Sequence, residues 1–302
     1  MTTAPRFLDD LSLVCLVCAD LDTTVRQCQE LLGIGPWEVY DFAPPIQYDT
    51  KLRGRDEPFT MRVAFGAVGN VGWAFLEPKS VSSIYAEFLE NSGSGFHHAA
   101  FLHDGLSYDQ AIAEFTRRGF PVVQQGNFCG RYCYLDTRER AHMIFELIED
   151  GDAEMQGLIY RHPGEGEGAV APVFDTTRAI GFVTSDLDDT RSVYEGLGIG
   201  PWLGGEADGA SGIRRATASV GRCAIELIQP ETGSSVYRDF LERRGTGVHH
   251  LSLGHADLGY DDCRNKFAAG GIATVGESEV DGHRVGYLET EAILGARIQI
   301  TD

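Results

Sequence analysis

The amino-acid sequence contains an internal repeat that spans most of its 302 residues. The hexapeptide LGIGPW occurs at positions 32–37 and again at 197–202, and a Gly-x-His-His motif ends at His98 and again at His250, 152 positions later. Because this spacing is kept over much of each copy, the chain is predicted to contain one structural unit twice. Nearly the same offset relates two further pairs, Arg62 with Arg214 and Tyr134 with Tyr287.

Composition indicates a folded protein and disfavours several kinds of partner. A length of 302 residues suggests two domains, and 43% hydrophobic residues with 10% aromatic residues are typical of globular proteins. The formal net charge of -20, with no basic run, disfavours nucleic acid and anionic membranes. We find no apolar run of the about 18 residues that a membrane span needs and no secretory signal. We therefore expect a cytoplasmic protein whose seven cysteines are reduced thiols.

The repeat divides the chain into a first copy over residues 7–149, a linker over 150–175 and a second copy over 176–302. Each copy shows the order strand, helix and strands, followed by the same order again, which predicts two β-α-β-β-β modules per copy. In the first copy the expected strands are 11–17, 61–67, 72–77, 96–102, 129–135 and 141–148, and the expected helices are 22–32 and 107–118.

Several of these segments resemble a known superfamily. A first strand followed by Asp-Leu-Asp, a helix ending in LGIG, a Gly-x-His-His strand and a last strand reading Ile-Phe-Glu-Leu are similar to the vicinal oxygen chelate (glyoxalase, bleomycin resistance protein and extradiol dioxygenase) superfamily. Each half resembles a methylmalonyl-CoA epimerase-like protein. The resemblance implies an α+β fold in which four βαβββ modules form two eight-stranded cups. It also implies four ligand positions per cup for a divalent metal ion, typically His, Gln or Glu, His, and Glu.

Transfer of these positions to the first copy gives two possible ligands. His98 and Glu146 match the pattern, whereas Leu13 and Ala74 stand at the other two positions. In the second copy Ala179 stands at the first of the four positions, where the superfamily typically has a histidine.

The second copy keeps three possible ligands, Glu226, His250 and Gln299. An amide oxygen is a legitimate metal ligand, and three protein ligands leave an open position for a substrate. We therefore expect the second cup to be the better site for a divalent ion, with Mg, Mn, Co, Ni, Zn and Fe not distinguished and a cup without metal as the alternative.

The resemblance favours an isomerase, epimerase or lyase that acts on a small carbonyl or acyl-thioester substrate through an enolate. A metal ion, or arginine and backbone donors in its place, would polarise the carbonyl. Glu226 is the candidate ligand and base, and His283, which lacks a counterpart in the first copy, is a candidate acid or base. The alternatives are an extradiol-type ring-cleaving dioxygenase and a non-catalytic protein that sequesters a small molecule. The expected partner is a small molecule, and a homodimer is compatible with the sequence.

Other repeated polar residues are predicted to be structural. Strand parity turns His97 and His249 away from the cups, and it places Cys15 and Cys18 on opposite faces of a strand, which disfavours a zinc site. The glycines of LGIGPW are expected to end a helix. The copies differ in one loop, because the first contains 13 extra residues around 43–58. These residues are expected to form a mobile flap over the first cup or a contact between the halves.

Overall fold

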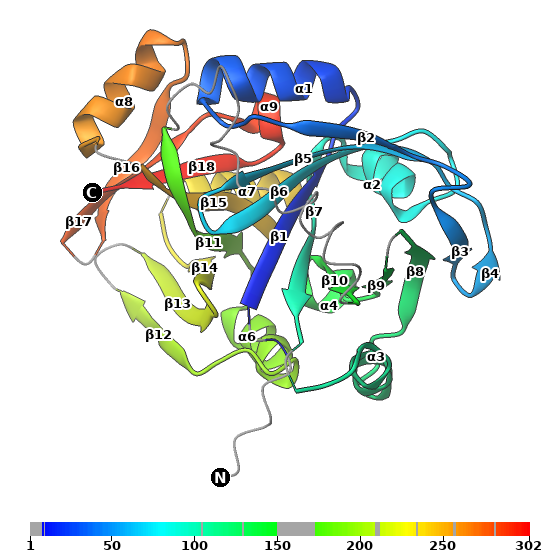
Figure 1. The fold of residues 1–302 in the computed structure, drawn as a ribbon. Coiled ribbons are helices and arrows are strands. Elements are labelled where there is room, and N and C mark those ends of the chain that lie inside the picture. The colour runs from blue at the N-terminus through cyan, green and yellow to red at the C-terminus, as the bar shows by residue number, and fades with distance from the viewer. Residues whose placement is uncertain are drawn as a thin grey trace.

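Each copy of the repeat forms one curved β-sheet with helices on its outer face, and the two sheets pack against each other (Figure 1). The fold is taken from a computed structural model. It describes residues 8, 10–103, 105–128, 130–149, 173–208, 212–233, 235–255, 258–280 and 282–302.

The first half contains two β-α-β-β-β modules joined by a helix, as the sequence predicts. In the sheet the first module gives the order β2-β5-β6-β1 and the second gives β7-β10-β9-β8. The elements are β1 (Asp10–Val17), α1 (Leu21–Gln27), η1 (Cys28–Leu32), β2 (Glu38–Phe42), β3 (Tyr48–Leu52), β4 (Arg55–Asp56), β5 (Met61–Val68), β6 (Val71–Pro78), α2 (Ile84–Ser92), β7 (Gly95–Leu102), α3 (Tyr108–Arg117), β8 (Val122–Asn127), β9 (Arg131–Leu135), α4 (Arg138–Ala141) and β10 (Ile144–Ile148).

The second half repeats this plan in an eight-stranded sheet of order β12-β13-β14-β11-β15-β18-β17-β16. The predicted tandem duplication is therefore confirmed. The elements are β11 (Phe174–Val183), α6 (Leu187–Gly196), β12 (Trp202–Asp208), β13 (Ile213–Val220), β14 (Cys223–Pro230), α7 (Val236–Arg244), β15 (Gly247–His255), α8 (Tyr260–Ala269), β16 (Thr274–Val280), β17 (His283–Leu288), α9 (Glu291–Leu294) and β18 (Arg297–Thr301).

Alternation along β1 separates the inside of the first cup from the core shared by the two halves. Leu13 and Cys15 belong to the apolar cluster inside the cup, whereas Val14 and Cys18 belong to the cluster on the outer face. The two cysteines thus lie on opposite faces of the strand, as strand parity predicts. Gly33 ends the helical segment with a φ of 65°, the left-handed conformation that favours glycine.

The 13-residue insertion of the first copy extends the sheet. It leaves β2 at one edge, and its strand β3 then pairs with β8 at the opposite edge, followed by the short strand β4. Both strands lie on the side of the first half away from the second (Figure 1). Residues 43–47 therefore pass between the two edges of the cup, where Gln47 is buried. The insertion brings two strands to the first sheet that the second lacks.

The interface between the halves is pseudo-symmetric. The turn at Gly69 packs on Asp175 at the start of the second half, and the turn at Gly221 packs on Asp10 at the start of the first. One apolar cluster contains residues of both halves. At its centre the Trp73 indole donates a hydrogen bond of 3.1 Å to the hydroxyl of Thr177. The halves thus share one core.

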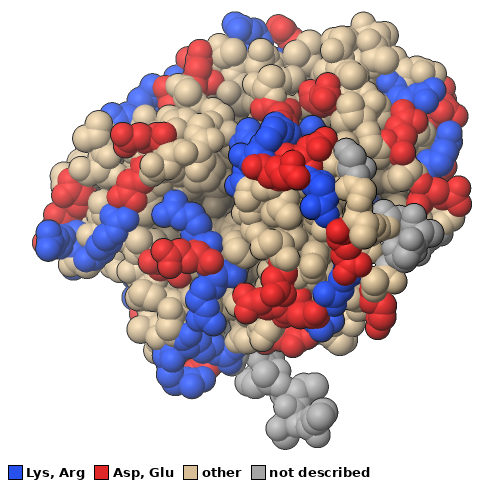
Figure 2. Space-filling view, turned by 180° about the vertical axis from the view of Figure 1, so that it is seen from behind, with Lys and Arg blue, Asp and Glu red and all other residues tan. Residues whose placement is uncertain are grey.

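The observed boundaries differ slightly from the predicted ones. Strand β11 begins at Phe174, two residues before the predicted start of the second copy, and most of the predicted linker lies outside the described residues. The predicted strand 141–148 begins only at Ile144, because Ala141 is the last residue of the short helix α4. No helix among the described residues is long and apolar enough to cross a membrane. Figure 2 shows basic side chains next to acidic ones over one face of the molecule.

Candidate functional sites in the two cups

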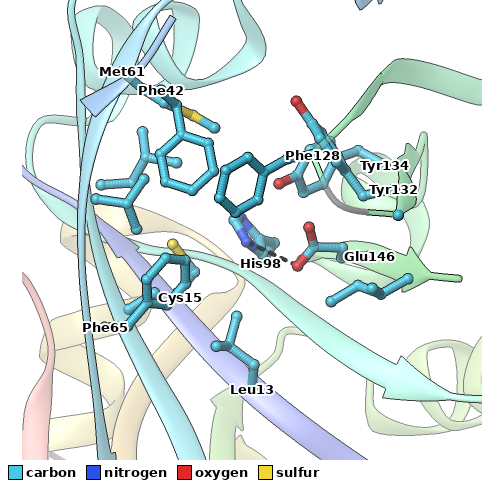
Figure 3. A pocket seen from close by; sticks show the side chains of 15 residues that line it. Leu13, Cys15, Phe42, Met61, Phe65, His98, Phe128, Tyr132, Tyr134 and Glu146 are labelled. Atoms are coloured by element: carbon cyan, nitrogen blue, oxygen red, sulfur yellow. Dashed lines mark ion pairs between the residues drawn. The ribbon is translucent and has the colours of Figure 1, made fainter. Parts of the chain in front are cut away.

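The first cup encloses an apolar cavity of about 90 Å³. In Figure 3 the rings of Phe42 and Phe128 lie side by side above His98 and Glu146; their centroids are 4.1 Å apart and their planes are tilted by 56°. Glu146 is the single carboxylate among the lining residues, and these include no lysine or arginine. The lining residues are Leu13, Cys15, Phe42, Met61, Val63, Phe65, Ala74, Leu76, His98, Phe128, Gly130, Tyr132, Tyr134, Glu146 and Ile148.

The polar groups of this cavity come from neighbouring strands. Nε2 of His98 on β7 lies 3.4 Å from Oε2 of Glu146 on β10. Tyr132 and Tyr134 on β9 bring their rings beside this pair. Burial, followed by the negative charge of Glu146, raises the pKa of both tyrosines. Their hydroxyls therefore stay protonated at neutral pH and can donate hydrogen bonds.

The paired histidines sit at a β-bulge in each half. Cys15 pairs with His98 and Leu16 with Phe96, so His97 is the extra residue, and the register shifts at the same place beside His249. A bulge re-aims the side chains around it. As a result Nδ1 of His97 lies 2.8 Å from Nδ1 of His98, so the predicted parity does not separate the two rings.

In the second cup Glu226 is held by two side chains. One oxygen lies 2.8 Å from the Arg215 guanidinium, and the other lies 3.1 Å from Nε2 of His250. Burial would raise the pKa of Glu226, but the hydrogen bond from His250 and the charge of Arg215 outweigh it and hold that pKa below its usual value. Glu226 is therefore ionised at neutral pH with both oxygens engaged.

A chain of hydrogen bonds runs from Arg297 through the two histidines to Glu226, and the donor of each bond can be assigned. The Arg297 guanidinium can only donate, so Nε2 of His249, 3.2 Å away, accepts. Nδ1 of His249 then carries a proton and donates to Nδ1 of His250, 3.0 Å away. His250 in turn donates from Nε2 to Glu226. In the first half Ile144 takes the place of Arg297, and Nε2 of His97 has no hydrogen-bond partner among the described residues.

The third predicted ligand of the second cup also has a partner. Gln299 donates a hydrogen bond of 3.1 Å to the Tyr287 hydroxyl, which lies 2.5 Å from the hydroxyl of Tyr237. Gln299 and His283 line an open hollow of about 400 Å³ at the mouth of this cup, and 65% of the His283 side chain is exposed. The other lining residues are Arg178, Arg215, Val280, Val285, Thr301 and Asp302.

The residues of neither cup fit a divalent metal ion well. In the second cup the guanidinium of Arg215 already neutralises Glu226 and would lie beside the ion. In the first cup Leu13 and Ala74 leave His98 and Glu146 as two ligands. No group of three or more His, Cys, Asp and Glu side chains among the described residues is arranged to hold a metal. The expectation of a metal at Glu226, His250 and Gln299 stays a prediction, which Arg215 weighs against.

Repeated arginines outside the cups have structural partners. Arg62 and Arg214 bind Asp22 and Asp188 in the first turn of the helix that follows the first strand of each half. Arg131 and Arg284 each pair with two carboxylates, one on a helix and one after the last strand. His103 and His255 each lie within hydrogen-bond distance of two backbone carbonyl oxygens, as expected for capping groups.

Sequence reasoning missed Arg215, which follows the repeated Arg214 directly. Strand alternation turns Arg214 out of the cup and Arg215 into it. At the repeat offset Arg215 corresponds to Val63, which lines the first cavity. An arginine in one copy where the other copy has a valine was the sequence difference that could have identified Arg215.

Two curved sheets built from four βαβββ modules, each with a His-His strand at its centre, define a class of tandem, cup-shaped proteins. A model of the Glyoxalase/Bleomycin resistance protein/Dioxygenase superfamily matches residues 14–134 and 178–287. The chain belongs to this superfamily, whose members include epimerases and dioxygenases and commonly use a divalent metal ion.

Individual relatives are distant. Over 75 residues the chain is 35% identical to "Uncharacterized protein YqjC" of Bacillus subtilis; this match covers 24% of the chain and 53% of the relative, so the chain spans about half of that relative's length. A mutant of 4-hydroxymandelate synthase from Streptomyces coelicolor is similar over 98% of this chain and 93% of its own, with a TM-score of 0.63 and 14% identity. Methylmalonyl-CoA epimerase from Mycobacterium tuberculosis is similar over 45% of this chain and 92% of its own, with a TM-score of 0.38 and 23% identity.

Proposed function

We propose that the protein is an isomerase, epimerase or lyase that transfers a proton on a small, uncharged carbonyl compound in the first cup. The observation that carries this proposal is the pair of His98 and Glu146 at the floor of an apolar cavity. A carboxylate in such a place is poorly solvated and well placed to accept a proton from carbon.

The cavity restricts the class of substrate. With Glu146 as its single carboxylate and no lining cation, it disfavours an anionic group. Its volume of about 90 Å³ is below the about 150 Å³ of an engineered apolar cavity that binds benzene, so it takes a group of a few heavy atoms. A short ketone, an aldehyde or the acyl end of a thioester meets both conditions.

Each polar group then has a role. Glu146 would take the α-proton with the oxygen that does not face His98, and His98 would hold that carboxylate in place. The hydroxyls of Tyr132 and Tyr134 would donate to the oxygen of the developing enolate. Phe42 and Phe128 would pack against the hydrocarbon part of the substrate. Return of the proton from Glu146 to a different atom of the enolate completes an isomerisation. An epimerisation is completed when solvent protonates the opposite face of the same carbon and Glu146 releases its proton to solvent.

Proton exchange tests this proposal. Short ketones, aldehydes and N-acetylcysteamine thioesters are incubated with the protein in D₂O, and loss of the α-proton signal is followed by NMR. We expect Glu146→Gln to slow exchange by about 10²–10⁴-fold, the usual cost of a well-placed base. Glu90→Gln on exposed α2 is the matched control. If Glu226→Gln slows proton exchange to a similar extent and Glu146→Gln does not, the reaction takes place in the second cup, where Glu226 or His283 would be the base.

The apolar lining of the cavity favours one second candidate, a protein that binds and sequesters a small molecule. Binding of a carbonyl compound without exchange of its α-proton would support it. The dioxygenase alternative has less support. Leu13 and Ala179 stand where a two-histidine, one-carboxylate iron site of this family would need its first histidine.

A further inference from the structure

We propose that the second cup is a binding site for a small organic carboxylate, in which the guanidinium of Arg215 takes the place of the metal ion. This site differs in chemistry from the first cup. It does not depend on the proton transfer proposed there.

The two cups differ at several equivalent positions. Where the first cavity has Val63, Gly130 and Ile148, the second hollow has Arg215, His283 and Thr301. Each of these changes adds a hydrogen-bond donor. Gln299 stands at the position of Glu146, and the carboxylate that the second cup gains, Glu226 at the position of Ala74, is paired with Arg215 at 2.8 Å.

A second cation reaches the hollow through a β-bulge. The register of β11 shifts between Thr177 and Ala179, so Arg178 is the extra residue and lines the hollow. In the first copy Ser12 is the extra residue of the corresponding shift on β1. Arg178 makes no ion pair with any residue that the structure describes, whereas Asp302 at the rim is paired with Arg284 at 2.9 Å. Arg284 is shared with Asp261 at 3.0 Å, so Arg178 is distinguished by having no described carboxylate within ion-pair distance and not by a net positive charge of the hollow.

The Arg215 side chain is fixed for this role. It bonds Glu226 at 2.8 Å and the Tyr237 hydroxyl at 3.3 Å, and 19% of its side chain remains exposed to the hollow. Glu226 is fixed in turn by His250. A guanidinium held in one orientation binds planar two-oxygen groups with little loss of entropy. Since Val280 and Val285 form the apolar part of the lining, a carboxylate with a hydrocarbon body fits the hollow better than an inorganic anion does.

Benzoate is a suitable probe because it carries no exchangeable α-proton, so its binding is independent of turnover in the first cup. Titration calorimetry with the full chain should show saturable binding of benzoate. Arg178→Gln should weaken it by about tenfold or more, the usual effect of losing a charged hydrogen bond. Arg191→Gln on α6 removes one cation outside the hollow and should leave the affinity unchanged.

The double variant Arg215→Val with Glu226→Ala gives the second cup the residues of the first and should abolish benzoate binding. If this variant does not fold, as judged by circular dichroism, Arg178→Gln alone decides the outcome. Unchanged affinity in the folded variants would overturn the proposal. Competition by inorganic phosphate as strong as that by benzoate would contradict the assignment to carboxylates. If the unaltered protein binds one equivalent of a divalent ion and Glu226→Ala does not, the site holds a metal ion instead of a carboxylate.

Discussion

Removing Arg215 alone should destabilise the protein more than removing Arg215 together with Glu226. In Arg215→Val, Glu226 stays buried with His250 as its partner and loses the charge 2.8 Å away. Loss of one partner of a buried ion pair costs about 3–5 kcal/mol. Because 19% of the Arg215 side chain and 11% of the Glu226 side chain are exposed, we expect the lower end, about 3 kcal/mol. This corresponds to a fall in Tm of about 6 °C, at about 2 °C per kcal/mol for a chain of this size.

The double variant carries Val and Ala, the residues that the first half has at positions 63 and 74. It buries no unpaired charge, so we expect it to be more stable than Arg215→Val by about 2 kcal/mol. Urea unfolding followed by both tryptophan fluorescence and circular dichroism measures these differences. A double variant as unstable as the sum of the two single variants would show that the pair is not coupled, and the reasoning about Glu226 would be wrong.

Three further predictions concern the fold around the cups. Gly181→Ala should cost about 1–3 kcal/mol in urea unfolding, because its Cβ would lie 1.9 Å from the His250 ring, whereas Cys15→Ala at the equivalent position should be tolerated better. Gly69→Ala should lower the free energy of unfolding more than Gly54→Ala, because its Cβ would lie 1.8 Å from the carbonyl oxygen of Asp175 whereas a Cβ at Gly54 meets open space. Equal losses of stability would mean that the interface between the halves rearranges to accept the added methyl group. Burial, followed by the charge of the neighbouring histidine, holds the pKa of His97 and of His249 well below 6.5. The free energy of unfolding should therefore be highest above pH 6.5 and fall as the pH drops through 6.5, because the unfolded state then binds protons that the folded state does not. In His97→Phe the free energy of unfolding in urea should depend less steeply on pH.

The repeat predicted the modules and much of the first cavity correctly. The resemblance to the superfamily implied that Leu13, His98 and Glu146 lie inside one cup, and all three line the first cavity. The repeat offset likewise relates Glu226, His250 and Gln299 to Ala74, His98 and Glu146 of the first copy.

What the sequence did not predict depends on contacts between distant segments. A bulge is defined only by the strand opposite it, so strand parity predicted neither the contact between the rings of His97 and His98 nor the place of Arg178 in the hollow. The pairing of the insertion with β8 joins strands about 75 residues apart in the sequence, and its charged residues showed no apolar alternation to reveal it.

The reciprocal contacts of Gly69 with Asp175 and Gly221 with Asp10 have the form of a two-fold interface between identical subunits. In a dimer of identical chains, any residue placed in one cup would also appear in the other. Joining the two copies in one polypeptide removes that restriction. The position of Val63 and Arg215 can then hold a hydrocarbon in one cup and a cation in the other, while both cups keep the same scaffold and the same core between them.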